Sequence, residues 1–358
     1  MEIGLVGLPN AGKSTIFNAL TSAKAVTANY PFTTIDPNIG VAEVPDDDFE
    51  SLVELMKPKK RVPTALRVVD IAGLVEGASK GEGLGNQFLG HIREVDAIAQ
   101  VVKCFTDTSA DSTSKRDPIS DIETINTELA LADISTCEKR VLKLTKEARS
   151  GDKEASRLLE NLNDLIDNLS NGSLAKNFQH IDDFKDLHLL TAKPMLFIAN
   201  VDEEAFKNKD FLMSEEVIAY GNDHNSDTVI VSARIEEELA ELDDEEADIF
   251  RSELAIDISA VDGLIRAAYH TLGLMSFFTA SSEECRAWTI KQGSTAVEAA
   301  GTIHTDFAKG FIKAEVIGLD ILISDSSYPK ARDLGHVRLE GKDYIVKNGD
   351  IIHFKFAV

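Results

Sequence analysis

Residues 7–14 read GLPNAGKS and match the pattern G-x-x-x-x-G-K-[ST]. An apolar stretch at residues 3–6 comes directly before this segment, and apolar residues at helical spacing follow it at Ile16, Phe17 and Leu20. The pattern therefore lies where a strand passes into a helix, which is the context in which such a loop binds phosphate. Its glycines let backbone N–H groups turn toward phosphate oxygens, and the helix N-terminus adds a positive dipole end. The segment predicts an α/β fold with a phosphate-binding loop; the alternative is a tight strand-to-helix turn that binds no ligand.

The side chains of this loop supply polar groups for a nucleotide and its metal ion. Lys13 is expected to reach the β- and γ-phosphate oxygens, and Ser14 is expected to ligate Mg²⁺ through its hydroxyl. The nucleotide contacts expected in the loop are Asn10, Ala11, Gly12, Lys13, Ser14 and Thr15.

A second motif indicates a nucleotide hydrolase that acts as a switch. Asp70 and Gly73 form a D-x-x-G pattern after residues 66–69, a strand-like stretch that is apolar except for Arg67. The Asp70 carboxylate is expected to hold Mg²⁺ through water, and the Gly73 N–H is expected to meet the γ-phosphate. We predict that Lys13, Asp70 and Gly73 form the catalytic set. Thr34 is a further expected Mg²⁺ ligand, because its hydroxyl lies where a first switch loop would close.

Glycines follow this motif closely. Residues 77–85 read GASKGEGLG and give the backbone the freedom expected of a second switch. The alternative is a passive linker.

Two later strands end in segments suited to base recognition. Residues 195–199 and 229–231 are apolar and strand-like, and polar residues follow each of them. The base contacts expected there are Asn200, Val201, Glu203, Ser232 and Ala233.

These motifs and several longer stretches make the chain resemble the Obg-related ATPase family, called YchF in bacteria and Obg-like ATPase in eukaryotes. The resemblance covers essentially the whole chain, and residues 6–10, 29–32, 70–88, 126–133 and 341–346 carry it. It implies an α/β P-loop NTPase fold (a G domain) with an inserted α-helical hairpin arm. It also implies a C-terminal TGS domain, which is a ubiquitin-like β-grasp module, and a cytoplasmic role in translation.

The sequence supports this layout independently. A capping-box pattern from Ser120 to Glu123 opens a stretch of apolar residues at helical spacing, which breaks near Ser150 and Gly151 and then resumes. This pattern predicts an antiparallel helical hairpin, with two ordinary crossover helices as the alternative. Short strands separated by glycine turns begin at about residue 277. The expected division is a first part of the G domain at 1–118, a helical insertion at 119–188, a second part of the G domain at 189–276 and the TGS domain at 277–358.

The base-recognition segment favours ATP over GTP. GTPases commonly carry N-K-x-D here, because the aspartate accepts hydrogen bonds from the N1–H and the N2 amino group of guanine. In this chain Val201 takes the lysine position and Glu203 takes the fourth position, the N-x-x-E variant that the resemblance links to ATP. Asn200 is then expected to meet the N7/N6 edge of adenine. If the loop that carries these residues were shifted by one position, the Asp202 carboxylate would come within reach of guanine. A GTPase or a dual ATP/GTP enzyme is therefore the alternative.

Hydrolysis is expected to be slow. Ras-like enzymes place a water-orienting glutamine directly after D-x-x-G, and Leu74 occupies that position here. Asn10 is a candidate K⁺ ligand, with a loop-bracing amide as the alternative. Family members often carry a histidine in the loop after Cys104 and Phe105, but residues 106–118 contain none, which argues against a histidine-based step. His91 is interpreted as a surface or core-edge residue.

Charge and composition restrict the partners. Sixty-one acidic and 37 basic residues give a net charge of -24, which repels anionic membranes and nucleic acid except where basic residues cluster. We therefore expect no membrane association and no DNA partner. The three cysteines show no C-x-x-C spacing, and no apolar run approaches about 18 residues. Neither a disulfide framework nor a protein-ligated zinc is expected, and the predicted location is the cytoplasm.

Residues 139–157, at the turn of the predicted hairpin, are a local exception to the acidity. They hold seven basic and three acidic residues, a local charge of +4. Such a tip is suited to phosphate, so contact with the ribosome or ribosomal RNA through the arm is a hypothesis, with the TGS domain as a second contact. The alternative is a solvated helix face.

Two function classes remain. The first is a slow ATP hydrolase that acts as a switch on the translation machinery, with Mg²⁺ as its ion and K⁺ as a candidate second ion. The second is a nucleotide-gated binding scaffold whose hydrolysis is incidental.

Overall fold

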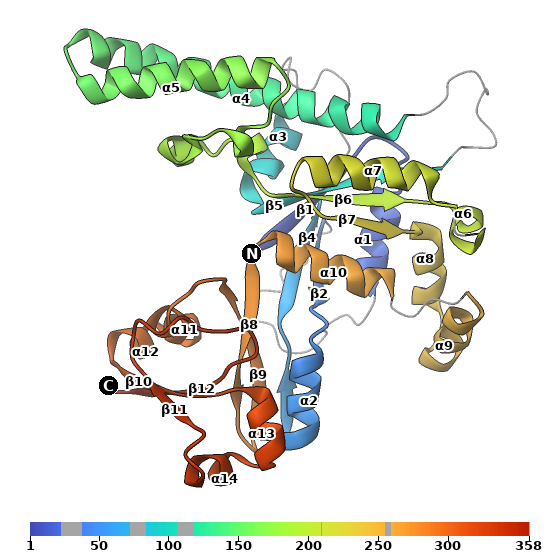
Figure 1. The fold of residues 1–358 in the computed structure, drawn as a ribbon. Helices are drawn as coiled ribbons and strands as arrows, with labels where there is room; N and C mark the ends of the chain where they lie inside the picture. Colours follow the sequence, from blue (N-terminus) through green and yellow to red (C-terminus); the bar gives the residue numbers. More distant parts are fainter. Residues whose placement is uncertain (23–37, 72–83, 106–116, 209, 255–258, 358) are drawn as a thin grey trace. The chain divides into compact units, whose positions relative to one another are not determined.

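The structure is a computed structural model that describes residues 1–22, 38–71, 84–105, 117–208, 210–254 and 259–357 (Figure 1). The chain forms two compact units. The first comprises Met1–Ala42 and Arg67–Thr271, and the second comprises Glu43–Leu66 and Leu272–Val358.

The first unit is built on a six-stranded sheet in the order β2-β4-β1-β5-β6-β7. Its strands are β1 (Glu2–Gly7), β2 (Ile39–Glu43), β4 (Ala65–Asp70), β5 (Ala97–Lys103), β6 (Met195–Asn200) and β7 (Thr228–Val231). The pairs β1/β4, β1/β5, β5/β6 and β6/β7 are all parallel. Strands β5 and β6 are buried along their whole length, as expected of central parallel strands covered on both faces. Because these strands run in one direction, the segments that follow β1, β4, β6 and β7 meet at one edge of the sheet.

Helices cover both faces of this sheet (Figure 1). The helices of this unit are α1 (Lys13–Ser22), α3 (Leu84–Glu94), α4 (Pro118–Arg149), α5 (Lys153–Ser170), α6 (Glu203–Asn208), α7 (Leu212–Asp223), α8 (Ala233–Glu241), α9 (Asp244–Glu253) and α10 (Ala260–Thr271), and not all of them lie on the sheet. Three short 3-10 helices, η2 (Ala175–Asn177), η3 (Ile181–Leu187) and η4 (Leu190–Ala192), lie between α5 and β6.

Helices α4 and α5 form the predicted hairpin arm, which projects from the sheet (Figure 1). The helix break is also where it was predicted, because Gly151 with φ +93° lies between the two helices. The start of α4 differs from the prediction. Asp117 caps the helix by accepting the Ile119 N–H at 3.0 Å, ahead of the expected capping box at Ser120. Pro118 at the first helical position explains the earlier start, since its fixed φ suits a helix and its missing N–H costs nothing there.

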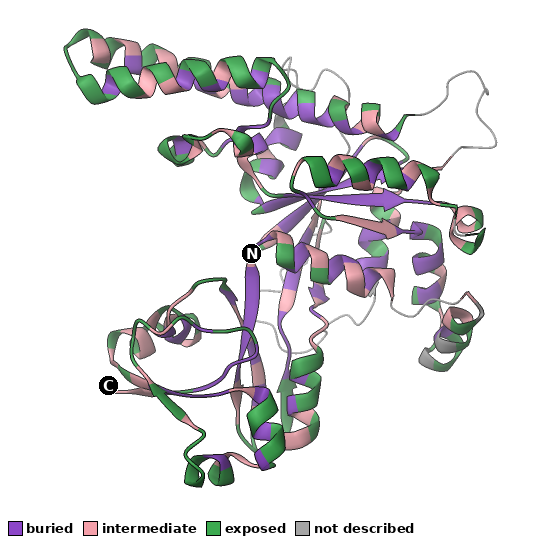
Figure 2. Ribbon diagram, in the orientation of Figure 1, coloured by how far each residue is buried: buried purple, intermediate pink, exposed green. Residues whose placement is uncertain are grey.

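Apolar side chains line the contact between the two arm helices. Figure 2 shows buried residues along the line where α4 and α5 meet, and green, exposed residues on the outer surfaces. Leu144 of α4 and Leu162 and Leu165 of α5 are 2% exposed or less and share one apolar cluster. The arm is therefore a packed body, consistent with its amphipathic pattern.

The second unit is a mixed sheet in the order β11-β10-β12-β8-β9-β3. Its strands are β3 (Lys60–Val62), β8 (Leu274–Ala280), β9 (Glu284–Lys291), β10 (Phe311–Ile317), β11 (Arg338–Glu340) and β12 (Ile351–Phe356). Its helices are α2 (Asp47–Met56), α11 (Ala296–Ile303), α12 (Thr305–Lys309), α13 (Leu319–Asp325) and α14 (Tyr328–Asp333).

Residues 43–66 belong to this second unit, although the expected division placed them in the first part of the G domain. Phe49 and Leu52 of α2 share an apolar cluster with Phe278 of β8, and β3 pairs in parallel with β9. Such long-range packing leaves no local signal in the sequence.

Candidate functional site

The phosphate-binding loop has the backbone shape that the motif predicts. Asn10 has φ +65° and Gly12 has φ +91°, while the Ala11 N–H donates to Leu8 O at 3.2 Å. Helix α1 begins directly after the loop, and its first bonds include Ile16 N–H to Gly12 O at 3.0 Å. Left-handed backbone in such a turn orients N–H groups toward one concave surface, which suits an anion.

Lys13 and Asp70 come together beside this loop. Asp70 ends β4, in register with Leu5 of β1, so its carboxylate lies next to the start of the loop. The Lys13 ammonium donates a hydrogen bond to Asp70 Oδ1, and the two side chains are only 11% and 18% exposed. The charged groups expected to act on phosphate and on Mg²⁺ are therefore adjacent. The Ser14 hydroxyl and the Asp70 carboxylate are hard oxygen ligands of the kind that Mg²⁺ prefers, so the residues present fit this ion.

Asn200 connects three loops of the site. Its Nδ2 donates to Ala11 O at 2.9 Å, and its Oδ1 accepts the Ala233 N–H at 3.0 Å. Asn200 is 3% exposed, and a Cβ on Gly12 would lie 2.2 Å from its Nδ2. The side chain predicted to read the base thus also braces the phosphate loop against the loop after β7. We name this arrangement of Gly12, Asn200 and Ala233 the clasp.

The residues next to the clasp are largely buried. Val201 is 3% exposed, and its N–H donates to Val231 O at 2.9 Å. Ser232 is 1% exposed, and its hydroxyl has no hydrogen-bond partner within the part of the chain that the structure describes. An unpaired buried hydroxyl keeps its hydrogen-bonding capacity for a ligand.

The two carboxylates after Val201 have different surroundings. Asp202 Oδ1 accepts the Ala205 N–H at 2.7 Å, so Asp202 caps the start of α6. Glu203 lies 3.6 Å from the Arg234 guanidinium and 3.7 Å from the Lys207 ammonium. This cap engages one carboxylate oxygen of Asp202, the residue on which the GTP alternative depends.

A pocket of about 760 Å³ opens at the phosphate loop. Asn10, Lys13 and Asp70 line it, as expected, and so do His91 and Glu94 of α3. His91, interpreted from its sequence position as a surface or core-edge residue, is exposed and also lines this pocket. Its position on the first helix after the glycine-rich segment is the feature of the sequence that could have placed His91 at the site.

Other predicted groups fall outside the described residues. These are Thr34, Gly73, Leu74, residues 77–83 of the glycine-rich segment and residues 106–116. The three cysteines are buried, and burial raises the pKa of Cys104 and of Cys137 to about 12. No cluster of three or more His, Cys, Asp or Glu suited to a metal ion occurs among the residues described, and none of the described helices is long and apolar enough to cross a membrane.

Family models match both ends of the chain. A model described as a 50S ribosome-binding GTPase matches residues 2–146. A second model, named YchF-GTPase_C and described as a protein of unknown function, matches residues 274–357.

Whole-length relatives give the same result. The chain is 50% identical to the ribosome-binding ATPase YchF of Bacillus subtilis, over 100% of both proteins. It is 48% identical to the ribosome-binding ATPase YchF of Haemophilus influenzae, over 100% of this chain and 99% of that protein.

A solved structure confirms the predicted fold class. The YchF GTPase of Schizosaccharomyces pombe matches with a TM-score of 0.89 and 35% identity, over 99% of this chain and 97% of that one. A GTP-binding protein from Pyrococcus horikoshii, 21% identical, shares the fold with a TM-score of 0.65. The fold is an α/β P-loop NTPase with an inserted helical arm and a C-terminal β-grasp module, and the chain belongs to the YchF family.

Proposed function

We propose that this protein is a ribosome-binding ATPase that hydrolyses ATP slowly with Mg²⁺ in the cytoplasm. The observation that carries the proposal is the arrangement of Lys13, Asp70 and the clasp at one edge of a parallel sheet. The names of the relatives support both the ATPase activity and the ribosome as partner. Lys13 would hold the β- and γ-phosphates, Ser14 would ligate Mg²⁺ directly, and Asp70 would hold it through water. Mg²⁺ would neutralise the charge that develops on the phosphates.

The base site supports ATP over GTP. In the clasp, Asn200 keeps one free hydrogen on Nδ2 and one free lone pair on Oδ1, which suit the N7 acceptor and N6 donor of adenine. Guanine needs a carboxylate that accepts from both N1–H and N2–H. Such a pairing would compete with the hydrogen bond that Asp202 Oδ1 accepts from the Ala205 N–H and with the ion pairs that Glu203 forms with Lys207 and Arg234.

Calorimetric titration with ATP and with GTP, each with Mg²⁺, tests this preference. We expect ATP to bind at least tenfold more tightly than GTP. Tighter binding of GTP would refute the proposal and return Asp202 to base recognition.

We propose that the rate of ATP hydrolysis depends on a monovalent cation bound at Asn10. Asn10 is exposed, lines the pocket and has left-handed backbone, so its amide is available to a K⁺ ion beside the phosphates. Hydrolysis measured in K⁺ and in Na⁺ buffers of equal ionic strength tests this point, and we expect the K⁺ rate to be higher. Equal rates would remove the ion from the mechanism and leave Asn10 as a bracing residue.

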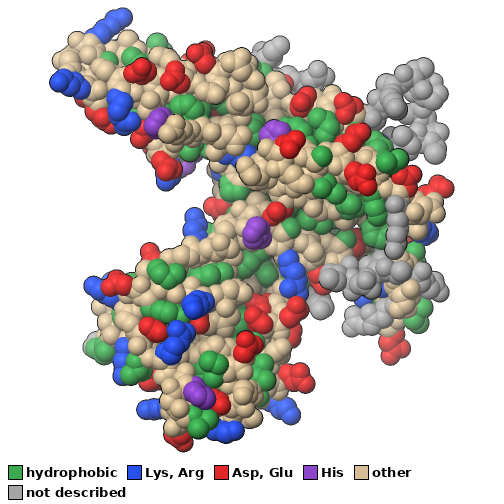
Figure 3. Space-filling view, viewed as in Figure 1, with side chains coloured by type: hydrophobic (Ala, Val, Ile, Leu, Met, Phe, Trp, Pro, Cys, Tyr) green, Lys and Arg blue, Asp and Glu red, His purple; other side chains and the backbone are tan. Residues whose placement is uncertain are grey.

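The arm tip is the proposed contact with ribosomal RNA. Figure 3 shows blue side chains gathered at the free end of the arm. Two of the seven cations expected to act there are engaged within the protein: Arg140 lies 3.4 Å from Asp186, and Arg157 lies 2.8 Å from Asp183. Five are exposed and form no ion pair with the residues described, namely Lys139, Lys143, Lys146, Arg149 and Lys153.

Charge reversal tests this contact. Changing Lys143, Lys146 and Arg149 to Glu should weaken association with purified ribosomes and flatten its salt dependence, with ATP turnover unchanged. In a control variant, Lys309, Lys330 and Lys342 of the β-grasp module are changed to Glu, so that the net charge changes by the same amount. Loss of binding in the control alone would move the interface from the arm to that module.

A further inference from the structure

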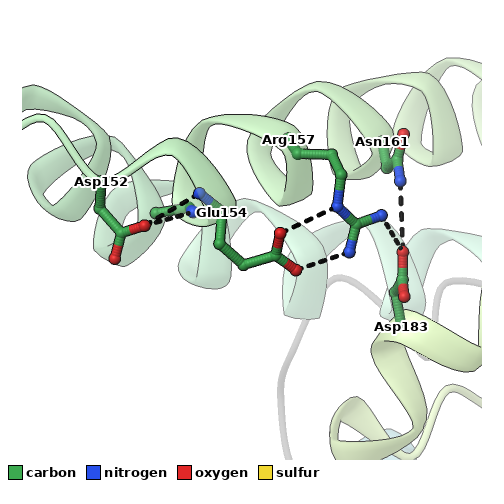
Figure 4. Close-up of polar contacts among 6 residues, drawn as sticks. Asp152, Glu154, Arg157, Asn161 and Asp183 are labelled. Atoms are coloured by element: carbon green, nitrogen blue, oxygen red, sulfur yellow. Dashed lines mark hydrogen bonds and ion pairs between the residues drawn. The ribbon is translucent and has the colours of Figure 1, made fainter.

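The segment between the arm and β6 is attached to its neighbours by a series of polar contacts. We name residues 173–193, which include η2, η3 and η4, the strut. Figure 4 shows its first attachment, in which Arg157 of α5 holds Asp183 at 2.8 Å while it also binds Glu154 at 2.7 Å. Asn161 donates to the same Asp183 carboxylate at 3.3 Å.

A second attachment joins the strut to α4. Asp133 is 1% exposed and accepts three hydrogen bonds, from the Leu190 N–H at 2.8 Å and from the Thr191 N–H and hydroxyl at 2.8 and 2.7 Å. Burial raises the pKa of the Asp133 carboxyl, while these hydrogen bonds act in the opposite direction. Phe184 and Leu189 also pack in the apolar cluster that holds the two arm helices together. The strut and the arm thus form one packed body.

The last residue of the strut reaches α3. The half-buried Lys193 ammonium donates to Arg93 O at 3.1 Å and to Val95 O, at the C-terminal end of that helix. A helix end leaves carbonyls without partners inside the helix, and a lysine there satisfies them and favours the negative dipole end. Helix α3 also borders the nucleotide site, because its His91 and Glu94 line the pocket at the phosphate loop.

Apolar packing reinforces this connection. Phe88 and Ile92 of α3 share a buried cluster with Ile125 and Leu129 of α4. Leu190 of the strut belongs to the same cluster. A displacement of α3 would therefore have to repack the base of the arm, because close-packed interiors transmit strain instead of absorbing it.

We propose that the strut, through Lys193 at α3 and Asp133 at α4, couples nucleotide binding at the phosphate loop to partner binding by the arm. This coupling rests on the proposed function for the identity of its two ligands, ATP and the ribosome. Because coupling is reciprocal, bound ribosome changes the affinity for ATP by the same factor by which ATP changes the affinity for the ribosome.

The test measures that factor in two lysine variants. Dissociation constants for a non-hydrolysable ATP analogue are determined for the full chain with and without saturating ribosomes. The dissociation constants with and without ribosomes should differ by about fivefold or more in the unaltered protein. Lys193→Met should bring their ratio close to one, because the methionine keeps an apolar stem but gives α3 no donor.

The strut itself supplies a matched control. Lys176 is also a half-buried lysine of the strut, and it donates to His224 O at 2.9 Å and to Ser226 Oγ at 2.8 Å, away from α3. Burial lowers the pKa of both lysines. Lys176→Met should therefore cost comparable stability while it keeps the full coupling ratio. An unchanged ratio in Lys193→Met, or an equal loss in both variants, would overturn the proposal.

A second measurement does not need the ribosome. Amide hydrogen exchange in α4, around Leu129 and Asp133, should change when the ATP analogue binds the unaltered protein and should stop responding in Lys193→Met. If the ribosome does not bind at all, the ribosome-binding proposal fails and this measurement still decides the coupling. An α4 response that persists in folded Lys193→Met would refute the role of Lys193.

Discussion

Replacing Gly12 with alanine tests whether the clasp holds the nucleotide site together. Gly12 has φ +91°, and a Cβ there would lie 2.2 Å from Asn200 Nδ2, more than 1 Å closer than the 3.4 Å at which ordinary contact begins. Asn200 must therefore move away, and it cannot then keep both its bond to Ala11 O and its bond from the Ala233 N–H.

The expected loss of stability has two parts. A residue with a side chain in left-handed backbone costs about 1–2 kcal/mol. The two hydrogen bonds of Asn200 contribute about 0.5–1.5 kcal/mol each. The free energy of unfolding should therefore fall by about 2–5 kcal/mol, a large part of the stability of an ordinary domain.

A matched change at Gly151 separates the backbone cost from the cost of the lost hydrogen bonds. Gly151 has φ +93°, almost the same as Gly12, but a Cβ there would meet nothing within 4 Å. Gly151→Ala should therefore lose only the backbone part, about 1–2 kcal/mol. Urea unfolding followed by circular dichroism measures both losses, and calorimetry measures ATP affinity, which should fall in Gly12→Ala alone. Equal losses in the two variants, or unchanged ATP affinity in Gly12→Ala, would refute the clasp.

Two helix caps and one buried thiol can each be tested by changing single residues. Asp117→Ala should lower the free energy of unfolding by about 1 kcal/mol in urea, because Asp117 caps α4, whereas Ser120→Ala should change it by less than about 0.5 kcal/mol. Asp202→Ala should lower stability by about 1 kcal/mol through the lost cap of α6 and leave the ratio of ATP to GTP affinity unchanged; a large shift of that ratio would show that Asp202 reads the base. Burial raises the pKa of Cys104 from 9.0 to about 12, so between these values the folded protein keeps a proton that the unfolded chain loses. The stability that this thiol contributes is therefore present below pH 9.0 and is lost as pH rises toward 12, so Cys104→Ala should flatten the alkaline fall in stability, measured by urea unfolding across that range.

Local patterns predicted the parts of the site that follow directly from strand ends. The phosphate loop, Asp70 and Asn200 each come after an apolar stretch, and parallel strands bring such ends to one edge of a sheet. The hairpin arm was predicted for a similar reason, since its apolar spacing and the break at Gly151 are both local.

Contacts between distant residues could not be predicted in this way. The clasp joins Asn200 to a carbonyl at Ala11, and an asparagine in a sequence carries no sign of which backbone group it will bind. The same applies to Arg140, which the charge pattern placed in a basic tip and which the structure pairs with Asp186. The sequence gives the number of cations in a segment, but the fold determines which of them form ion pairs within the protein.

The pairing of Lys13 with Asp70 indicates how the site selects its ligand. The two opposite charges are mostly buried and neutralise each other, and leaving one partner of such a pair alone costs about 3–5 kcal/mol. A nucleotide without metal would engage Lys13 but leave Asp70 facing the phosphates, and a metal ion without nucleotide would engage Asp70 but face the Lys13 ammonium. When the ion pair between Lys13 and Asp70 is broken, only the complex of nucleotide and Mg²⁺ gives both side chains a group of opposite charge. We therefore expect the phosphate loop to take up nucleotide and metal as one unit, because neither component alone compensates both charges of the pair.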